Sequence, residues 1–586
     1  MPVMLSRRQI RRWLEDWHDQ FVTHLSRADA QLQPALLGLV VGLLTGLVIV
    51  AFRWLVELGQ AGILPGQDPE GFENLPLLWR FLLPVLSGLL IGLLFHLWSK
   101  GDQVVGIIHV MERLAYHQGR LPFRKLWLQF VGAALALVGG HSIGREGPSV
   151  HLGAATGSLL GQYLAVPNNN VRILVACGTA AAIAASFNTP LAGVVFAMEV
   201  VMLEYTITSF IPVILAAVSA TGVTIAVYGN SPVFIIPELS FNSLRELPFV
   251  VLLGLLCGLT ATLFIRLVAW LAAYSREWPF VVKTTAAGII VGGIGIFYPQ
   301  VLGIGYDTVG EALAGELGLV LLLGILLAKF AATSTAIGFG VPGGVVGPSL
   351  FLGAIVGSAM GYVVMSTAPA YSSEIGFYTL LGMTAMMGAM FRAPLAALLA
   401  ILEMTYSPTV IFPGMLAIVI AELTRSEAFH QVSFFRALLQ ARGLDINMNP
   451  MTQALRRIGV ASQMSLRFVV LPQKPTAEDL RRALMDGPHW ILLQSGEAPD
   501  TVMPAIDVVR YVDEFPDIDR VDLVNIPAKR SAIAGIHKRA SLLEAEELMR
   551  AKGVDSLYVY DMPAPAMRRV KGIIERSIIE SSYRFQ

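Results

Sequence analysis

Gly144-Arg145-Glu146-Gly147-Pro148 places a carboxylate directly before an apolar run that the chain later repeats. The run at residues 147–158, GPSVHLGAATGS, returns at residues 347–358 as GPSLFLGAIVGS, with eight of twelve positions identical. A second pair follows in the same order, because Gly178 to Glu199 matches Gly382 to Glu403. The chain therefore contains an internal repeat, and each copy holds a glycine-rich helix start followed by a helix that begins at an X-Pro pair.

The composition is that of a polytopic membrane protein. Of the 586 residues, 55% are hydrophobic and 14% are charged, and the mean hydropathy is +0.63. Uncharged stretches such as Ala35 to Phe52, Phe81 to Trp98 and Leu317 to Ala328 approach or reach the length that crosses a bilayer. Others are short or interrupted by glycine and proline, which predicts broken or re-entrant helices around a transport site. The net charge of zero gives no reason to expect a nucleic-acid partner.

The chain consists of three regions. Residues 1–30 combine apolar residues at helical spacing with several arginines, which predicts an amphipathic helix on the cytoplasmic side. That helix lies either in the membrane interface or against the protein's own cytoplasmic face. Residues 31–443 form an all-α membrane domain. From residue 444 to 586 the charge density rises and long apolar runs cease, which marks a soluble cytoplasmic domain.

The soluble domain also contains a repeat. Thr476 and Ser541 each fit a helix N-cap with an acid three residues later, and each opens an amphipathic helix followed by two strand-like runs. This order resembles a tandem pair of CBS domains, an α+β regulatory module; a merely structural cytoplasmic domain is the alternative. Nucleotide-binding examples of that module often carry an aspartate where this chain has Ile578. Adenine nucleotide is therefore not a favoured ligand, and we expect no cofactor.

The glycine-rich helix starts have the chemistry of an anion site. A helix N-terminus presents unsatisfied N–H groups and a partial positive charge, so two such starts that converge near the membrane midplane would bind an anion without a full cation. Proline fits the first turn of each start, because the N–H that it lacks has no partner there. Glu146 precedes one start, and its ionised side chain would compete with the anion for that site. The alternative is a carboxylate paired with Arg145 at a loop–helix junction.

At this point the sequence resembles a known family. The run Gly144-Arg145-Glu146-Gly147-Pro148, the run Gly343-Gly344-Val345-Val346-Gly347-Pro348 and the internal repeat resemble the CLC family of chloride channels and proton/chloride antiporters over residues 35–442. The resemblance implies a homodimer in a lipid bilayer, with inverted halves and one pathway for chloride in each subunit, and it makes Glu146 the gating glutamate. The positions that it assigns to the anion are Val105, Gly106, Ile107, Gly144, Arg145, Gly147, Val345, Val346, Gly347 and Phe435. We expect a bacterial inner membrane protein with both termini in the cytoplasm.

Three anion positions depart from the family pattern. Val105 replaces the serine that coordinates the central anion, Val346 stands at a phenylalanine position, and Phe435 aligns with the coordinating tyrosine. Backbone N–H groups remain, but fewer neutral donors should make the central site weaker or more hydrophobic. We therefore expect a preference shifted away from strongly hydrated anions.

The proton route departs as well. Antiporters of the family usually carry a second, intracellular glutamate where this chain has Val200. Glu204, one helical turn further on, is a candidate substitute, with a cytoplasmic-rim carboxylate as the alternative. Glu199 is a second relay candidate, although we interpret Glu199 and Glu403 mainly as structural or vestibule carboxylates near helix ends. We expect a proton-sensitive chloride channel first, a proton/chloride antiporter as the alternative, and a membrane sensor with a vestigial transport domain as a remote third.

Other motifs do not support an enzyme. Gly140-His141-Ser142-Ile143-Gly144 matches the pattern of a serine hydrolase elbow, but it follows a membrane helix and lacks the strand–turn–helix context. His141 and His151 are too few and wrongly spaced for a metal site. Cys177 and Cys257 lie in apolar runs, which predicts buried free thiols.

Overall fold

The computed structural model describes residue 25, residue 234 and residues 31–65, 70–99, 103–205, 207–230, 241–405, 410–444, 450–496, 498–515, 518–564 and 567–581. Apart from Leu25, the amphipathic helix expected at residues 1–30 lies outside them. The chain divides into two compact units. The larger unit comprises Pro34–Tyr163 and Arg172–Ile446, and the smaller comprises Met1–Gln33, Leu164–Val171 and Asn447–Gln586.

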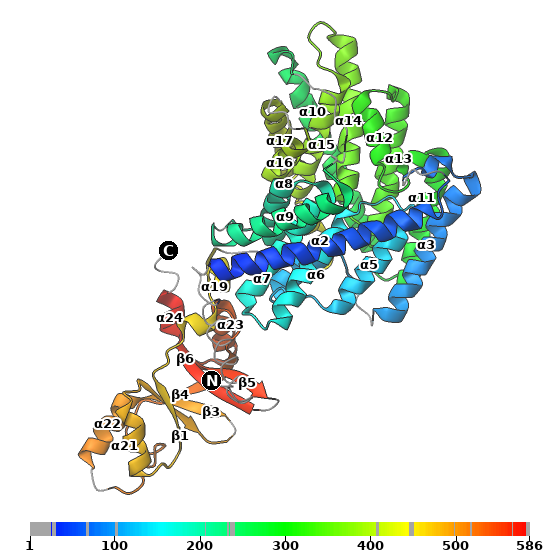
Figure 1. The fold of residues 1–586 in the computed structure, drawn as a ribbon. Helices are drawn as coiled ribbons and strands as arrows, with labels where there is room; N and C mark the ends of the chain where they lie inside the picture. The colour runs from blue at the N-terminus through cyan, green and yellow to red at the C-terminus, as the bar shows by residue number, and fades with distance from the viewer. Residues whose placement is uncertain are drawn as a thin grey trace, which may run out of the picture. The chain divides into compact units, whose positions relative to one another are not determined.

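The larger unit is helical, which confirms the predicted all-α fold (Figure 1). Its first half runs in the order α2 Leu32–Ala61, η1 Phe72–Asn74, α3 Leu77–Trp98, α4 Ile107–Tyr116, α5 Phe123–Val138, α6 Glu146–Tyr163, α7 Asn168–Phe187, α8 Pro190–Phe196, η2 Ala197–Met202 and α9 Ile207–Tyr228. Its second half runs η3 Leu244–Glu246, α10 Leu247–Tyr274, α11 Phe280–Phe297, η4 Pro299–Val301, α12 Tyr306–Ala314, α13 Leu319–Gly338, α14 Val346–Thr367, α15 Ile375–Phe391, α16 Pro394–Thr405, α17 Ile411–Leu423, η6 Thr424–Ala428 and α18 Phe434–Ala441.

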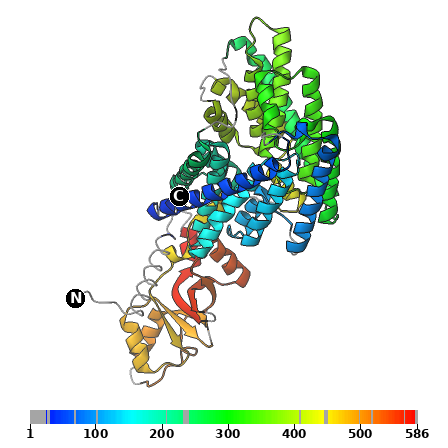
Figure 2. The same cartoon turned by 45° about the vertical axis from the view of Figure 1, so that its right-hand side comes forward.

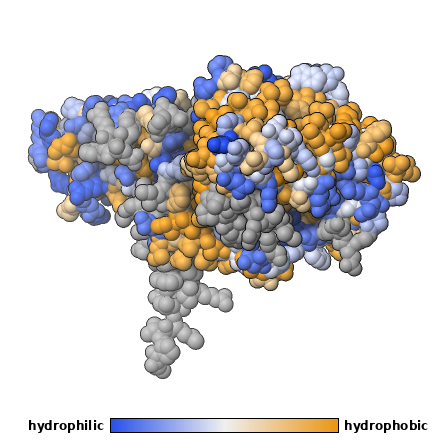
Figure 3. All heavy atoms as spheres, turned by 90° about the horizontal axis from the view of Figure 1, so that it is seen from above, coloured by the Kyte–Doolittle hydropathy of each residue, from blue (hydrophilic) through white to orange (hydrophobic). Residues whose placement is uncertain are grey.

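The surface of the larger unit suits a bilayer. In the described part of the chain, eight helices are long and apolar enough to cross a membrane: α2, α3, α7, α9, α10, α11, α13 and α14. Many large apolar side chains are exposed on the outside of this unit, and Figure 3 shows large orange areas between hydrophilic ones on the face that it displays. Val320 is 87% exposed and Leu97 is 72% exposed. Lipid would bury such residues, because water does not reach them there.

Glycine pairs bring helices of each repeat into close contact. A Cβ added to Gly153 would lie 2.1 Å from the carbonyl oxygen of Gly178, and the equivalent distance from Gly353 to Gly382 is 2.3 Å. The absence of side chains lets α6 cross α7, and α14 cross α15, at backbone contact. α14 and α15 lie side by side (Figure 1).

The predicted repeat elements are present. The two glycine-rich runs start α6 and α14, each one residue before the Gly-Pro pair. The X-Pro pairs start α8 at Pro190 and α16 at Pro394, where the missing proline N–H has no helical partner. α8 continues directly as the short π-helix η2. Three apolar helical segments in the described part of the chain are shorter than the spanning helices, Pro190–Met202, Ile375–Phe391 and Pro394–Met404, which confirms the prediction of short apolar helices. Cys177 and Cys257 are buried free thiols, as predicted.

The smaller unit contains a six-stranded mixed sheet in the order β1-β2-β3-β4-β5-β6 (Figure 2). Its elements are α19 Pro450–Arg457, α20 Val460–Gln463, β1 Phe468–Pro472, α21 Ala477–Met485, β2 Trp490–Gln494, β3 Pro499–Pro504, α22 Ala505–Glu514, β4 Ser531–His537, α23 Leu542–Lys552, β5 Ser556–Ala564, β6 Met567–Glu575 and α24 Arg576–Ser581. β1 pairs in parallel with β2, and β2 antiparallel with β3; β4, β5 and β6 repeat this pattern.

The predicted helix caps of the smaller unit are confirmed. The Thr476 hydroxyl accepts from the backbone N–H of Asp479, and Ser541 forms a capping box with Glu544. The second of the two strand-like runs after the first of these helices is Val502 to Ile506. It is a strand only to Pro504, because α22 starts at Ala505. The smaller unit thus contains the same α+β arrangement twice, as the sequence predicts for residues 444–586.

Candidate functional site

The two repeats meet at a backbone bridge between their glycine-rich loops. The N–H of Gly144 donates to the carbonyl oxygen of Gly344 at 2.8 Å, and the N–H of Gly344 donates to that of Gly144 at 2.7 Å. A Cβ on Gly147 would lie 2.5 Å from the Gly344 Cα, so this contact requires glycine. The bridge brings the N-termini of α6 and α14 together, as the anion-site hypothesis requires.

The Glu146 carboxylate lies at the N-terminus of α14. Glu146 is the first residue of α6 and is fully buried. Its Oε2 accepts from the N–H of Gly347 at 3.1 Å, and its Oε1 accepts from the Tyr306 hydroxyl. A negatively charged side chain therefore occupies a position where free helical N–H groups would otherwise attract an anion.

Arg145 does not neutralise this carboxylate. Among the described residues, no ion pair joins Arg145 to Glu146. The Arg145 Nη2 donates instead to the carbonyl oxygen of Ser186 at 3.2 Å, and the guanidinium lies 5.5 Å from the centroid of the Tyr306 ring. The alternative interpretation, a local Arg145–Glu146 pair, is therefore not what the structure contains.

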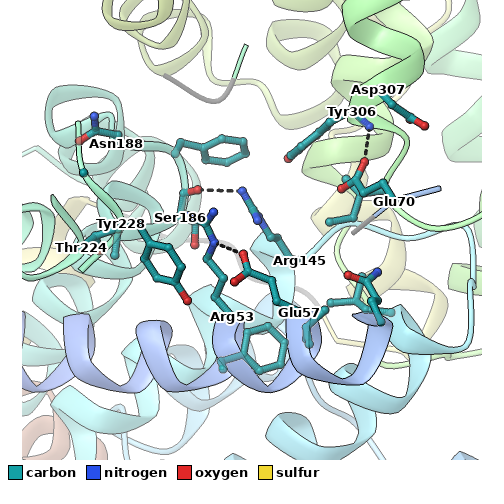
Figure 4. A pocket seen from close by; sticks show the side chains of 18 residues that line it. Arg53, Glu57, Glu70, Arg145, Ser186, Asn188, Thr224, Tyr228, Tyr306 and Asp307 are labelled. Atoms are coloured by element: carbon teal, nitrogen blue, oxygen red, sulfur yellow. Dashed lines mark hydrogen bonds and ion pairs between the residues drawn. The ribbon is translucent and has the colours of Figure 1, made fainter. Parts of the chain in front are cut away.

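A cavity of about 420 Å³ opens beside Arg145 and Tyr306, and we name it the Tyr306 cavity (Figure 4). Its charged lining consists of Arg53, Glu57, Glu70, Arg145 and Asp307. Arg53 and Glu57 form an ion pair at 2.6 Å within α2. The mixture of both signs means that the charge of this cavity depends on the protonation of its carboxylates.

A second cavity of about 460 Å³, the Gly106 cavity, is lined by Val105, Gly106 and Gly343. Gly343 precedes the bridging Gly344, and Arg145 of the Tyr306 cavity follows the bridging Gly144, so both cavities reach the bridge between the repeats. The charged lining residues of the Gly106 cavity are three cations, Arg276, Lys283 and Arg442. A basic cavity that leads to two helix N-termini can concentrate and bind a small anion.

Two of the predicted anion positions, Val105 and Gly106, line the Gly106 cavity, and its described lining offers no hydroxyl group. Val105 lines it, and none of the described lining residues is serine, threonine or tyrosine. Gly106 has a φ of +81° and precedes the buried Ile107, which starts α4. Only glycine adopts this backbone readily, so the N–H groups at the start of α4 depend on it.

The predicted anion positions Val345, Val346 and Phe435 lie at helix starts. Val345 precedes α14 and Val346 is its first residue, and both are buried. Phe435 is buried on α18, where it stacks on Phe391 with 5.3 Å between ring centroids. Leu438, one helical turn after Phe435, lines the Gly106 cavity. The structure thus brings α18 to the same cavity as Val105.

Glu199 and Glu403 bind helix N-termini across the repeat. The Glu199 carboxylate accepts from the N–H groups of Leu395 and Ala396 at the start of α16, at 3.2 and 2.9 Å. The Glu403 carboxylate accepts in the same way from Leu191 and Ala192 at the start of α8, at 2.9 and 2.8 Å. Each glutamate therefore caps a helix that belongs to the other half of the chain.

Glu204, the other relay candidate, is engaged by a cation. Its carboxylate lies 3.7 Å from the Arg172 guanidinium, and both side chains are nearly buried. Its role in proton transfer stays a prediction. Val200 is buried in η2.

Three residues of the site were missed by sequence reasoning: Glu70, Tyr306 and Lys329. Lys329 carried a signal, because it is a cation within the apolar helix α13 and such residues usually have a functional partner. Its Nζ is fully buried and donates to the carbonyl oxygens of Val301, Gly303 and Ile304, each at 3.1 Å. Glu70 and Tyr306 carried no comparable signal.

Comparisons with known proteins find relatives of this arrangement. The model of the voltage gated chloride channel family matches residues 87–426. A putative chloride channel protein ClcB-like from Ralstonia nicotianae is 32% identical over 430 residues, which are 71% of this chain and 99% of that protein. The H(+)/Cl(−) exchange transporter ClcA of Vibrio cholerae is 28% identical over 428 residues, 71% of this chain and 92% of that protein. The solved structure of a slow cyanobacterial Cl−/H+ antiporter matches with a TM-score of 0.62 and 25% identity, covering 70% of this chain and 97% of its own.

Proposed function

The chain belongs to the CLC family of chloride channels and proton/chloride antiporters, and from this premise we propose that it transports chloride through the bridge between its two cavities, with Glu146 as the gate. It is an integral membrane protein of the CLC anion-transport type. The chloride pathway, the gate and the mode of coupling are the proposed parts.

One observation carries the proposal: the Glu146 carboxylate accepts from the N–H of Gly347 at the start of α14. An anion bound to that N–H and the ionised side chain cannot occupy the same position. Protonation removes the charge that holds the side chain there, so a proton and an arriving chloride both favour its displacement. Transport should therefore increase as the pH falls.

The Gly106 cavity supports the proposed chloride pathway. Arg276, Lys283 and Arg442 line it and would raise the local concentration of anions. Val105 offers no hydroxyl group to this cavity, so chloride would be coordinated mainly by backbone N–H groups next to apolar side chains. A site with few donors compensates poorly for the hydrogen bonds to water that an anion loses on binding. Strongly hydrated anions lose more of these bonds, so the site should favour weakly hydrated anions.

We propose passive, proton-gated conduction as the first mode. Val200 supplies no proton acceptor, and the Glu204 carboxylate is engaged in an ion pair with Arg172 at 3.7 Å. Proton-coupled exchange is the second mode, and it is favoured by two of the relatives, which are described as a H(+)/Cl(−) exchange transporter and a Cl−/H+ antiporter. In that mode Glu204 or ordered water would complete the proton route.

Reconstitution of the purified full chain in liposomes tests both modes. A chloride gradient should drive passive chloride flux that increases in acid. Uphill proton movement driven by the same gradient would contradict the channel mode and support exchange. The complete absence of anion flux, in protein that remains folded, would contradict the proposed function and support the remote alternative of a membrane sensor.

The proposal includes the expected assembly and orientation. We propose a homodimer with one pathway per subunit, both termini in the cytoplasm of a bacterial cell, and a CBS-like tail that regulates transport. The repeated β-α-β-β pattern of the smaller unit supports the CBS-like assignment. Single-molecule photobleaching of labelled protein in liposomes should show two labels per particle, and one label per particle would contradict the dimer.

A further inference from the structure

Tyr306 connects two carboxylates of the Tyr306 cavity. Its hydroxyl donates to Glu146 Oε1, and its backbone N–H donates to Glu70 Oε2 at 2.7 Å. Figure 4 shows the second bond as a dashed line between Tyr306 and Glu70, with Asp307 next to it. A change in the bond at the backbone of Tyr306 can therefore reach the gate through one side chain.

The Glu70 bond completes the N-terminus of α12. Tyr306 is the first residue of that helix, so its N–H has no partner within the helix. Gly305, with a φ of +83°, turns the chain into the helix. Lys329 holds the segment before Gly305, because its Nζ donates to the carbonyl oxygens of Val301, Gly303 and Ile304. Lys329 thus anchors the loop before α12, and Glu70 accepts from the first N–H of the helix itself.

Charged groups from four elements face Glu70. Asp307 of α12 disfavours its ionised form, whereas Arg145 before α6 and Lys329 of α13 favour it. The ion pair of Arg53 and Glu57 on α2 lines the same cavity. Burial is the largest influence, because it removes water from the carboxylate.

Together these influences place the pKa of the Glu70 carboxyl near neutral pH. Glu70 lies between α2 and α3, outside the spanning helices, and burial together with Asp307 raises the pKa of its carboxyl to about 7. The carboxyl is then mostly ionised about one pH unit above this value and mostly protonated about one unit below it. A group with this property in a water-accessible cavity can report the pH on that side of the membrane.

We propose that Glu70 is a proton sensor of the Tyr306 cavity, and that it controls transport through Tyr306, which holds the Glu146 carboxylate on Gly347. Glu70 is a positioning residue in this scheme, since it touches neither chloride nor Gly347. The inference rests on the proposed function, because it assumes that displacement of Glu146 opens the chloride pathway.

Ionised Glu70 keeps the gate closed. A hydrogen bond to a carboxylate is stronger than one to a neutral carboxyl, so the ionised form fixes the backbone of Tyr306 and keeps its hydroxyl on Glu146. Protonation of Glu70 weakens its bond to the Tyr306 N–H and relaxes the start of α12. The N–H of Gly347 then remains as the firm donor to Glu146. The expected effect is roughly a fivefold change in the ratio of displaced to seated Glu146, from the difference between charged and neutral hydrogen bonds.

The test uses the full chain in liposomes, with chloride flux measured while the pH changes on one side at a time. The side that opens to the Tyr306 cavity should show a step in flux near neutral pH. Glu70→Gln should raise the flux roughly fivefold on the alkaline side of this step and abolish the step itself. Glu73→Gln is the matched control, because Glu73 lies on η1 in the same connection between α2 and α3, whereas the hydrogen bonds of Tyr306 go to Glu70 and Glu146, and it should keep the step.

A double variant separates the tyrosine connection from a simple change in cavity charge. In Tyr306→Phe the hydroxyl bond to Glu146 is absent, so adding Glu70→Gln should change the flux little. If Glu70→Gln has the same effect with and without the tyrosine hydroxyl, Glu70 acts only through space, and the proposed connection is overturned.

Asp307→Asn provides a second measurement that does not depend on removing Glu70. Because Asp307 raises the pKa of Glu70, the neutral variant should move the flux step to a lower pH. A purely structural role for Glu70 predicts no shift. Wild-type flux without a step near neutral pH would overturn the inference and leave the proposed function intact, whereas the absence of any wild-type flux would overturn the proposed function first.

Discussion

Replacing Glu146 by glutamine should remove most of the pH dependence of chloride flux. In the seated position the carboxylate accepts two hydrogen bonds, from the Gly347 N–H and from the Tyr306 hydroxyl. Glutamine has the same shape but no charge, and its single carbonyl oxygen replaces two equivalent carboxylate oxygens. The glutamine NH2 group can only donate a hydrogen bond. It would therefore face either the Gly347 N–H or the Tyr306 hydroxyl, which are both donors to Glu146, without forming a bond to that donor.

The size of the effect follows from these bonds. A hydrogen bond to a charged group contributes about 1.5–3 kcal/mol, and one between neutral groups about 0.5–1.5 kcal/mol. The loss over two bonds is about 2–3 kcal/mol, which corresponds to roughly a 30- to 150-fold shift towards the displaced side chain. Flux at about pH 7.5 should then come within roughly twofold of the wild-type rate in acid.

The assay is chloride efflux from liposomes, measured between about pH 4.5 and about pH 7.5 on both sides. Glu57→Gln is the control, because Glu57 is a carboxylate of the same cavity but lies on Arg53 and has no bond to the α14 N-terminus. That variant should keep the wild-type acid activation. If Glu146→Gln also keeps its full pH dependence, the gate lies elsewhere, and the competition mechanism is wrong.

Three further predictions concern the filter, the caps and the buried lysine. Val105→Ser should restore a donor at the Gly106 cavity and tighten chloride binding by roughly threefold to tenfold in isothermal titration calorimetry, and an unchanged affinity would show that the filter alignment is wrong. Glu403→Gln should weaken the cap of α8 and lower the free energy of unfolding by about 1–2 kcal/mol, and Glu199→Gln should have a similar effect at the start of α16; thermal unfolding in detergent measures both, and an unchanged melting temperature in both variants would contradict the capping role. Lys329→Met should leave three buried carbonyl oxygens without their donor and lower the stability by about 3–5 kcal/mol, whereas a melting temperature within about 1 °C of the wild type would contradict its anchoring role.

The repeated motifs made much of the fold predictable. Identical glycines at residues 147–158 and 347–358 located α6 and α14 to within one residue, and the X-Pro pairs located α8 and α16. These signals are local, because a helix start depends on residues within one turn of it. The caps at Thr476 and Ser541 were predictable for the same reason.

The surroundings of Glu146 were not predictable, because they depend on contacts between distant segments. Tyr306 reaches Glu146 from 160 positions away and Glu70 reaches Tyr306 from 236 positions away, and neither contact follows a helical or strand period. The partners of Glu199 and Glu403 were missed for a similar reason. Each acid was expected near the end of its own helix, but the helix that it caps belongs to the other repeat.

The reciprocal contacts indicate a local two-fold relation between the repeats. Gly144 and Gly344 exchange hydrogen bonds, and Glu199 and Glu403 exchange caps. The same relation extends to the two cavities. Gly106 and Gly305 both precede a helix with φ near +80°, at +81° and +83°. The helix after Gly106 starts at the Gly106 cavity, and the helix after Gly305 starts at the Tyr306 cavity.

The side chains break this relation at the gate. Glu146 and Val346 are equivalent first residues of α6 and α14, yet only Glu146 has a carboxylate that can reach the N–H groups of the opposite helix. Ile107 and Tyr306 are likewise the first residues of equivalent helices, and only Tyr306 has a hydroxyl to hold that carboxylate. In the proposed pathway, the repeated backbone lines the passage from both sides, while two unmatched side chains close it from the Tyr306 cavity alone. Protons on that side should control the gate, and acidifying only the Gly106 cavity should have the smaller effect on chloride flux.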